Sequence, residues 1–330
     1  MAGRLHRLLH DERNVDLLME LQYNFQLGPD PIGDAARAAG LSPEAAVERL
    51  RSLAKSGILK RIGFYYNYRA QGKKAALIAF AAGDNYKVLA DIFRGDPDVT
   101  HNYLRDHPEY NVWIVMKRPT REELLRDADE AAKKAGVDRW IALFSKKTYK
   151  LSVKYDLISG VSRSGRYWRV VENPPRAEEL GVDPRLPKLV RVLHLNLNPY
   201  KSVAERLSMS VDEVLDAVNL LLSKGVLMDP GAALDGHRAG FLENSMVVME
   251  PGELGEEGTC AKAAELPYST HVVLRESYPP GAWRHVCYFM AHAVNRDLIN
   301  EIVDEAKAYC RPRDVMAIFS LEDLKPGYVR

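Results

Sequence analysis

The chain repeats itself at long range, and this repeat limits its possible folds more than any other feature. The interval from Ser42 to Ser210 equals the interval from Gly57 to Gly225. Each serine stands before an apolar pattern with helical spacing, and each glycine follows that pattern. An interval of about half the chain is too long for a solenoid, so we expect a duplicated module in which each copy buries its own core.

The duplication also carries a polar cluster. His101 and Arg105 recur as His271 and Arg275. The spacing from histidine to histidine equals the spacing from arginine to arginine, 170 residues in each case. Taken singly, a histidine before an arginine in a strand is more often a structural residue, but its repetition favours a function. Imidazole and guanidinium groups together suggest a site for an anionic ligand.

The first copy divides into two patterns. Helical patterns followed by a strand predict a winged helix-turn-helix, at residues 15–25, 32–39, 42–56 and 58–66. Ser42 is the expected N-cap of the third helix, with Pro43 in its first turn. The order strand, helix, strand, strand, helix, strand predicts a ferredoxin-like βαββαβ sandwich, at residues 74–80, 86–94, 99–105, 111–116, 120–135 and 140–150. We expect Val88, Leu89 and Ile92 to face inward from the helix at 86–94.

The second copy follows the same plan, with helices expected at 186–197, at 203–207 and from 210 to 225. The fold class predicted is α+β, a tandem repeat of a winged helix-turn-helix and a ferredoxin-like sandwich. The expected domains are 1–68, 69–158, 186–240 and 241–330, and residues 159–185, rich in glycine, proline and charge, are the expected linker.

Composition excludes some functions. The 46 basic and 45 acidic residues give a formal charge of +1, so the chain has no global field of the kind on which non-specific nucleic-acid binding depends. The three cysteines (Cys260, Cys287 and Cys310) have no CxxC spacing, which argues against a disulfide framework, a structural zinc site or an iron–sulfur cluster.

The first residues and the longest apolar run indicate where in the cell the protein is expected. The first residues lack the apolar core and cleavage site of a signal peptide. The longest apolar run, residues 75–82, is far too short to span a membrane and fits a buried strand. We therefore expect a cytoplasmic protein that is not bound to a membrane.

A winged helix-turn-helix followed by a βαββαβ domain resembles the feast/famine (Lrp/AsnC) family of transcriptional regulators, and DNA binding is one function that this resemblance implies. The third helices argue against it. Residues 42–56 carry a net charge of +1, and residues 210–224 carry −2. Carboxylates presented to phosphates repel them, so DNA is an unlikely partner of the second copy.

A closer resemblance is to the siroheme decarboxylase family, whose two related subunits share the regulator architecture. The first half is similar to one subunit in the motifs at 60–69, 100–107 and 110–113. The second half is similar to the other subunit at 198–200, 203–207 and 235–241, and in the His271, Arg275 and Trp283 series. The chain is therefore similar to a natural fusion of both subunits.

This resemblance implies an enzyme, a carboxy-lyase that removes carbon dioxide from two acetate side chains of siroheme. The product would be didecarboxysiroheme, in an alternative route to heme or in heme d1 biosynthesis. No cofactor is expected, because the macrocycle can take up the developing electron density and the iron enters with the substrate. No metal site of the protein is expected either. The two halves are expected to form an intramolecular pseudo-dimer, and a homo-oligomer is possible.

The residues that match the family divide into two roles. His101 and His271 are the expected proton donors, and thus the catalytic residues. The expected substrate-binding residues are Arg105, Arg275, Arg61, Arg69, Tyr65, Tyr103, His107, Asn111, His237, Arg238 and Trp283. The sequence favours one working site, centred on the first copy, although two sites stay open.

Structural roles are the alternative for several of these residues. Tyr65 could pack within the wing, Trp283 within the core, and His237 and Arg238 in a surface salt link. Four lysines suggest a solvated strand edge: Lys146, Lys147, Lys150 and Lys154. Two other functions also remain, a feast/famine transcription factor and a heme-binding protein without catalysis that uses His101 or His271 as axial ligand.

Overall fold

The computed structural model describes residues 5–326. Its contacts divide the chain into two units, and each unit takes segments from both halves of the sequence. Unit 1 contains residues up to 71, 150–242 and 292–298, and unit 2 contains 72–149, 243–291 and residues from 299 onward. The boundaries of the four expected domains and of the linker stay a prediction, and the outermost residues of the first and last domains, 1–4 and 327–330, lie outside the described part.

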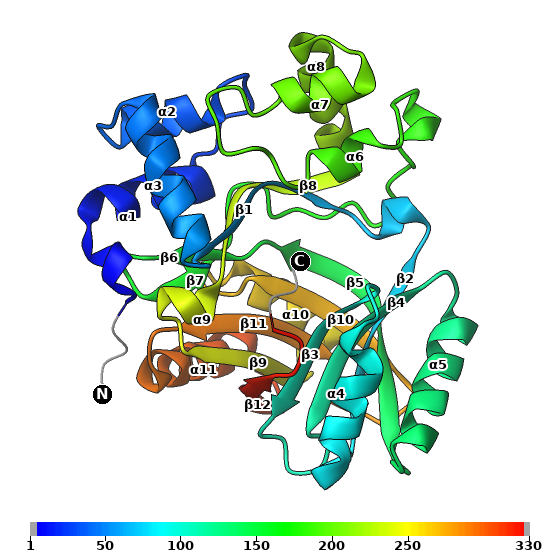
Figure 1. Cartoon of the computed structure of the whole chain (residues 1–330). Helices are drawn as coiled ribbons and strands as arrows, with labels where there is room; N and C mark the ends of the chain where they lie inside the picture. The colour runs from blue at the N-terminus through cyan, green and yellow to red at the C-terminus, as the bar shows by residue number, and fades with distance from the viewer. Residues whose placement is uncertain (1–4, 327–330) are drawn as a thin grey trace. The chain divides into compact units, whose positions relative to one another are not determined.

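Unit 1 holds two sets of helices, each followed by a strand (Figure 1). The first set is η1 (Arg7–His10), α1 (Glu12–Tyr23), α2 (Pro31–Ala38), α3 (Pro43–Lys55), β1 (Leu59–Tyr66) and η2 (Arg69–Gln71). The second set is η4 (Glu178–Leu180), α6 (Leu186–Leu189), α7 (Lys201–Leu207), α8 (Val211–Ser223), β8 (Leu227–Leu234) and α9 (Gly236–Ala239). The bounds of α3 and α8, and those of β1 and β8, are offset by the same interval as Ser42 and Ser210, which confirms the repeat.

Capping explains where the two equivalent helices begin. Ser42 accepts a hydrogen bond from the backbone N–H of Ala45, and Pro43 occupies the first turn of α3, as predicted. Ser210 and Glu213 form a capping box at the start of α8. Both helices then bury one apolar stripe, so the third helix of each copy is fixed by the same local chemistry.

The strand β1 is paired on both edges. It runs antiparallel to β8, with Gly63 opposite Gly231. On its other edge, the N–H of Phe64 donates to Val190 O (3.2 Å), and the N–H of Leu193 donates to Ile62 O (2.8 Å). The helix expected at 186–197 is therefore wrong beyond residue 189, because the next residues satisfy the edge of β1 instead of continuing α6.

Gly63 permits this second pairing. A Cβ atom at Gly63 would lie 2.4 Å from the carbonyl oxygen of Arg191, and the residue has a positive φ of 151°. Only glycine tolerates both conditions. The backbone at residues 190–193 can therefore reach β1 only because residue 63 has no side chain.

Part of the expected linker pairs with the segment that precedes it in unit 1. The strand β7 (Val161–Arg163) lies in the linker and pairs with β6 (Lys154–Asp156), which lies before it, and Val161 also pairs with Ala293 at the end of β11 (Cys287–Ala293). Gln22 of α1 holds Tyr155 by two hydrogen bonds, one to its N–H (2.8 Å) and one to its carbonyl (3.0 Å). This part of the chain is attached to the helices and is not a free spacer.

Unit 2 contains the strands and helices of both βαββαβ patterns, except for residues 150–151 and 292–298, which belong to unit 1. Those of the first copy are β2 (Lys74–Phe80), η3 (Gly83–Asn85), α4 (Tyr86–Arg94), β3 (Val99–Arg105), β4 (Val112–Arg118), α5 (Arg121–Lys134) and β5 (Trp140–Leu151). Those of the second are β9 (Glu243–Glu250), α10 (Gly255–Glu265), β10 (His271–Tyr278), β11 (Cys287–Ala293), α11 (Arg296–Cys310) and β12 (Asp314–Asp323).

Eight of the described strands close into a ring. Their order is β10, β5, β2, β4, β3, β12, β9, β11 and back to β10. The strands of the two copies join directly at two places, β3 with β12 and β5 with β10. The ring therefore has an interior to which both copies contribute side chains.

Helices cover the outside of this ring. In the first copy, α4 packs against β3, and α5 packs against β2 and β4 (Figure 1). Leu89 faces inward as predicted, but Val88 and Ile92 are exposed, and Ala90 and Phe93 take their place. The core-facing stripe of α4 is thus rotated relative to the prediction, because a short helix offers more than one apolar stripe and its packing selects one.

Apolar side chains from both copies fill the ring interior. They include Leu77, Trp113, Ile141 and Leu143 of the first copy and Met246, Val248, Tyr288 and Ile318 of the second. All of these side chains are at least nine-tenths buried. The interior is therefore a packed core in which each polar group needs a partner or a ligand.

The cysteine prediction is wrong for one pair. Cys260 of α10 and Cys287 of β11 form a disulfide, with their Cα atoms 5.5 Å apart. Packing of α10 against β10, the neighbour of β11, brings them together across 27 residues of sequence, which no local spacing reveals. Cys310 is reduced and buried.

No helix within residues 5–326 has the length and the apolar character needed to cross a membrane.

Candidate active site

The two histidine–arginine pairs face the ring interior. On β3, His101 lies opposite Val115 and Tyr103 lies opposite Trp113. Directly opposite residues of an antiparallel pair point to the same face, and Val115 and Trp113 belong to the interior core. His101, Tyr103 and Arg105 therefore share the inner face of β3.

The second copy repeats this placement on β10. Val273 lies opposite Tyr288, which is an interior residue. Because side chains alternate along a strand, His271 and Arg275 share the face of Val273. The structure therefore brings both expected proton donors and both arginines to the inner side of one ring.

Each arginine bridges to the last strand of the other copy. Arg105 Nη1 donates to the carbonyl of Ile318 in β12 (3.0 Å), and Arg275 Nη1 donates to the carbonyl of Leu143 in β5 (3.1 Å). The two acceptors occupy equivalent positions, because β5 and β12 are the last strands of their βαββαβ patterns. The guanidinium of Arg105 also lies 5.1 Å from the ring centre of Tyr103. These contacts fix the direction of both cations.

Both histidines are less buried than Arg105. His101 and His271 are half-buried, whereas Arg105 is 5% exposed. His101 Nδ1 lies 3.0 Å from the hydroxyl oxygen of Thr100, which orients the imidazole. A partly accessible imidazole beside a fixed guanidinium can deliver a proton to a bound anion.

A cluster of aromatic side chains surrounds His107. Its ring centre lies 5.4 Å from that of Trp283, 5.8 Å from Tyr110 and 6.3 Å from Trp113. The Nδ1 atom of His107 accepts the N–H of Tyr110 (2.9 Å) and of Glu109 (3.2 Å). Burial lowers the pKa of His107, which favours the neutral imidazole. Because Nδ1 accepts these two N–H groups, the neutral ring carries its proton on Nε2.

Trp283 also contacts His285, for which the sequence predicted no role. The indole N–H of Trp283 donates to the carbonyl of His285 (2.8 Å), and His285 Nε2 lies 2.8 Å from Asp314 Oδ2. The hydrogen bond from His285 lowers the pKa of Asp314. Asp314 begins β12, 29 residues from His285, so only the strand pairing could reveal this contact.

Unit 1 carries a separate group of cations around Tyr65. Burial raises the pKa of Tyr65, and the positive charges of Arg69, Arg191 and Arg61 oppose this increase. Arg61 and Arg69 were predicted as substrate-binding residues, but Arg191 was not. It was expected within a helix, whereas its backbone lies against β1.

Two lysines expected on a solvated edge are instead buried in unit 1. Lys150 is 4% exposed and Lys154 is 2% exposed, so the strand-edge interpretation is wrong for both. Lys154 Nζ lies 3.1 Å from Asp229 Oδ1 and donates to the carbonyl of Pro230 (3.2 Å). Burial lowers the pKa of Arg61 to about 10, and Asp229 opposes this effect. The aspartate thus offsets the desolvation of two neighbouring cations.

Three predicted residues are engaged with the backbone or lie at the surface. The side chain of Asn111 accepts the N–H of Ala82 (2.9 Å) and donates to the carbonyl of Gly83 (2.9 Å), which holds the turn after β2. Arg238 donates to the carbonyl of Ser56 at the end of α3 (3.2 Å). His237 is exposed. The contacts of Asn111 and Arg238 are structural, and a role toward substrate stays a prediction for all three.

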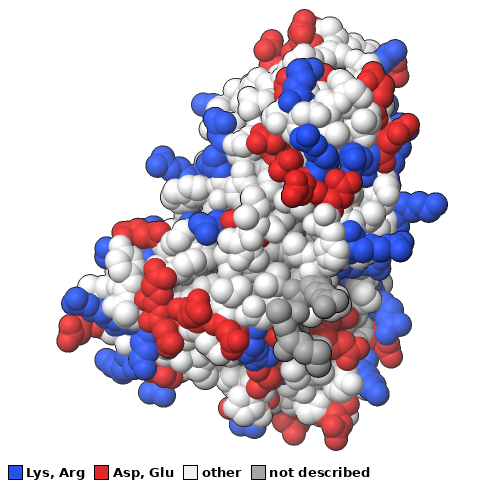
Figure 2. Space-filling model, turned by 90° about the vertical axis from the view of Figure 1, so that its left-hand side faces the viewer, with Lys and Arg blue, Asp and Glu red and all other residues white. Residues whose placement is uncertain are grey.

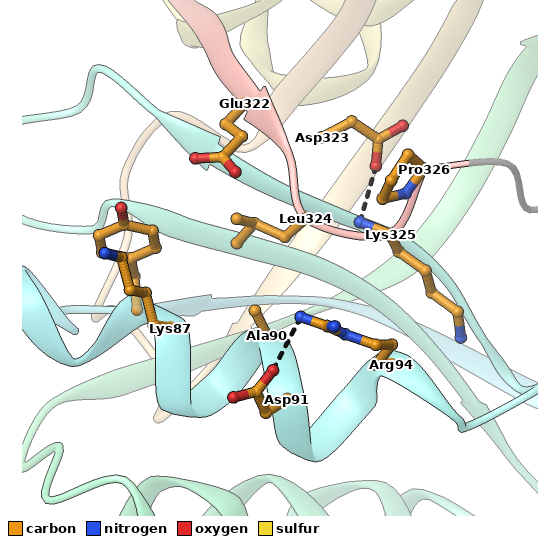
Figure 3. Close-up of a pocket in the computed structure, with 10 residues that line it drawn as sticks. Lys87, Ala90, Asp91, Arg94, Glu322, Asp323, Leu324, Lys325 and Pro326 are labelled. Atoms are coloured by element: carbon orange, nitrogen blue, oxygen red, sulfur yellow. Dashed lines mark hydrogen bonds and ion pairs between the residues drawn. The ribbon is translucent and has the colours of Figure 1, made fainter.

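A surface groove in unit 2 lies on the helix side of the ring. Residues of α4 line one wall, and residues 322–326 line the other (Figure 3). Arg94 is paired with Asp91 (2.8 Å), and Lys325 Nζ donates to backbone carbonyls that include that of Val99 (2.8 Å). The groove is lined by both acidic and basic side chains, and several of them are already paired with other protein groups. We therefore assign no ligand to this groove.

Two groups of residues have the chemistry to bind an anionic, flat ligand: those on the ring interior of unit 2 and the cations around Tyr65 in unit 1. Both combine guanidinium groups with aromatic rings, and unit 2 adds half-buried imidazoles. Within residues 5–326, no group of three or more histidine, cysteine, aspartate and glutamate side chains is arranged to hold a metal ion. The chemistry available is carboxylate binding and proton transfer.

Comparison with known proteins identifies the family. Residues 71–150 and 238–325 match the AsnC-like ligand binding domain. The chain is 26% identical to a siroheme decarboxylase of Hydrogenobacter thermophilus over 94% of this chain and 92% of that protein. It is 33% identical to the siroheme decarboxylase NirG subunit of Paracoccus pantotrophus, over 39% of this chain and 83% of the subunit.

A solved structure has the same fold. The crystal structure of the siroheme decarboxylase NirDL superposes with a TM-score of 0.65 at 22% identity, covering 96% of this chain and 93% of that one. A second crystal structure of NirDL contains an iron-uroporphyrin III analogue. The chain, with its two AsnC-like ligand binding domains, belongs to the siroheme decarboxylase family.

Proposed function

We propose that this protein is a siroheme decarboxylase that converts two acetate side chains of siroheme to methyl groups. The observation that carries the proposal is the match to the Hydrogenobacter enzyme, which covers 94% of this chain. The inward-facing His101, Arg105, His271 and Arg275 support it, because they supply the groups that the reaction needs. The product is didecarboxysiroheme.

The reaction is redox-neutral. The bond between the acetate methylene and its carboxyl carbon breaks, carbon dioxide leaves, and the bonding electron pair stays on the carbon attached to the macrocycle. That carbon then takes up one proton, and the conjugated macrocycle stabilises the charge in between. No other cofactor is required in this proposal, and the siroheme iron enters with the substrate.

The protein's part is to hold the spectator carboxylates and to place the proton. Guanidinium groups bind carboxylates with two parallel hydrogen bonds, and a guanidinium has five N–H donors, so the bonds of Arg105 and Arg275 to carbonyls are compatible with this task. Arg61 and Arg69 extend the same role to unit 1. His101 and His271 deliver the protons, and the ring centre of Tyr103 lies 6.3 Å from that of His101. His107 and Trp283 bind the substrate in this proposal.

We also propose that the two halves form an intramolecular pseudo-dimer of the Lrp/AsnC type. Each half would contribute a winged helix-turn-helix and a ferredoxin-like sandwich. The pairings of β3 with β12 and of β5 with β10 support this arrangement. A cytoplasmic location, expected from the sequence, is part of the same proposal.

Mass analysis of siroheme incubated with the anaerobic protein tests the proposal. We expect the successive loss of two carbon dioxides, and we expect His101→Ala and His271→Ala to slow it. His10→Ala, a change at an exposed histidine, is the control. Tight binding with no loss of mass would instead identify a heme-binding protein, and unchanged rates in both variants would refute the roles of the two histidines.

A further inference from the structure

The segment from Gly165 to Glu172, here called the strap, belongs to the stretch that the sequence presents as a linker. It is attached to unit 1 at several points. The N–H of Gly165 donates to Ser152 Oγ (2.9 Å), and the N–H of Leu151 donates to the carbonyl of Trp168 (3.0 Å). A backbone held in this way presents its side chains in fixed directions.

The far end of the strap is fixed as well. Val171 packs so closely on Gly225 that a Cβ atom at residue 225 would lie 2.4 Å from it. Glu172 Oε2 lies 3.1 Å from Arg69 Nη2. Through this ion pair, the strap contacts one of the cations around Tyr65.

Cations and aromatic rings alternate along the strap. The guanidinium of Arg166 lies 5.1 Å from the ring centre of Tyr167, and that of Arg169 lies 5.5 Å from the ring centre of Trp168. Lys150 Nζ lies 5.8 Å from the same indole. Three cations are thus placed on two rings that belong to consecutive residues.

The exposure of these groups suits a ligand rather than a core. Arg166 and Arg169 keep their guanidinium groups accessible at the surface, and Tyr167 and Trp168 are half-buried. Lys150 lies beneath them, and its burial lowers the pKa of its ammonium to about 8. Glu172 is the only carboxylate of the strap, and it is engaged with Arg69. The strap therefore presents positive charge beside flat apolar surface.

We propose that the strap and Lys150 form a second binding surface for the carboxylated tetrapyrrole, with Trp168 against the macrocycle and with Arg166 and Arg169 on its peripheral carboxylates. This inference rests on the proposed function. A flat conjugated ring stacks on an indole, and guanidinium groups bind carboxylates at its rim. A spacer between two domains would need neither feature.

Absorbance titration of the full chain with two porphyrins tests this surface. Uroporphyrin III has eight carboxylates, and coproporphyrin III has the same macrocycle with four. We expect Arg166→Gln with Arg169→Gln to weaken uroporphyrin binding by about tenfold or more, since one charge-assisted hydrogen bond contributes about 1.5 kcal/mol or more. Coproporphyrin binding should change less. We expect Trp168→Leu to weaken the binding of both.

A matched double variant is the control. Arg185→Gln with Arg206→Gln removes the same charge from exposed positions of unit 1 outside the strap, and we expect its affinities to stay within twofold of wild type. Circular dichroism verifies that each variant is folded. Unchanged uroporphyrin affinity in the folded strap variants would overturn the inference.

The same titrations separate this inference from the proposed function. If wild-type protein decarboxylates siroheme and the strap variants bind uroporphyrin normally, the function stands and the strap has no binding role. If wild-type protein removes no carbon dioxide but the strap variants still lose uroporphyrin binding, the strap binds porphyrins and the proposed reaction is wrong.

Discussion

Lys150 shows at the scale of one residue how burial changes chemistry. Its pKa is lowered to about 8 by burial, so its ammonium is charged below that pH and neutral above it. The attraction that Lys150 adds for an anion is therefore present below pH 8 and lost as the pH rises through this value.

We predict that uroporphyrin affinity of the wild-type protein falls by up to about tenfold between pH 7 and 9, as expected for the loss of one charge-assisted interaction. The Lys150→Met variant should bind uroporphyrin more weakly than wild type at pH 7, and its affinity should change little between pH 7 and 9. Lys188→Met, at an exposed lysine, serves as control. Parallel curves for wild type and Lys150→Met would show that another group titrates.

His107 makes a prediction about stability. Burial lowers its pKa in the folded chain, partly opposed by the nearby Glu109 and Asp106 and reinforced by His285. Below about pH 6.5, the ordinary histidine pKa, the unfolded chain binds more protons than the folded one, so the free energy of unfolding falls as the pH is lowered.

We expect His107→Gln to reduce this fall. Urea denaturation at pH 7.5 and pH 5.5 measures it, because the wild type should lose more stability between the two values than the variant does. His10→Gln, at an exposed position, should behave as wild type. An equal loss in wild type and His107→Gln would mean that His107 does not stay neutral in the folded protein.

At the scale of elements, the strands of the ring depend on the two arginines that bridge between copies. Removing Arg105 leaves the buried carbonyl of Ile318 without this donor, and removing Arg275 does the same to Leu143. We expect Arg105→Met and Arg275→Met to lower the free energy of unfolding by about 1–3 kcal/mol each. Chemical denaturation measures both, with the exposed Arg94→Met as control. A change at one site only would show that the equivalence is geometric and not energetic.

The strap makes a second prediction at this scale. Gly225 has a φ of 72° and contacts Val171, whereas Gly181 has a φ of 71° and no neighbour within 4 Å of an added Cβ. Gly181→Ala therefore measures backbone strain alone, roughly 1–3 kcal/mol. We expect Gly225→Ala to destabilise the fold further and to weaken uroporphyrin binding.

Adding Val171→Ala to Gly225→Ala should recover the steric part of the loss, because the smaller side chain leaves room for the new methyl group. The strain from the positive φ should remain. Equal stabilities of Gly225→Ala and Gly181→Ala would mean that the strap yields at Val171 without loss.

At the scale of the whole molecule, the distribution of charge argues against DNA as a partner. Acidic and basic side chains are interspersed on the face shown in Figure 2. Arg49, a cation of α3, is engaged with Asp11 (2.6 Å) and Asn14 (2.9 Å) of unit 1. The helix α8 carries Asp212, Glu213 and Asp216 in place of cations.

We predict that gel shifts with random duplex DNA show no complex at physiological salt. Non-specific affinity comes almost entirely from cations placed on phosphates, and the two third helices offer few. We expect the variant with Asp212, Glu213 and Asp216 changed to the corresponding amides to bind DNA no more tightly than with a dissociation constant in the millimolar range. A salt-resistant complex of the wild-type protein would show that these helices read DNA.

Several features followed from the sequence because local chemistry determines them. The capped third helices, the order of the strands and the spacing of the two copies were predicted and are confirmed. The resemblance to the siroheme decarboxylase family is confirmed as well. Capping residues, apolar periods and motifs act over a few neighbouring positions, so they can be recognised directly in the sequence.

Other features depend on which segments meet, and only the tertiary structure decided them. The segment after α6 became a partner of β1, because Gly63 leaves room for the carbonyl of Arg191. Cys260 contacts Cys287, and His285 contacts Asp314, across 27 and 29 residues of sequence. No spacing rule encodes these encounters.

The same distinction applies to the candidate site. The sequence by itself determined that His101, Arg105, His271 and Arg275 form two equivalent pairs. The tertiary structure decided that both pairs face one ring interior, that Lys150 is buried, and that the strap is fixed to unit 1. The physical reason is that residue types and local periods limit what each segment can do, whereas burial and charge pairing arise only when distant segments pack together.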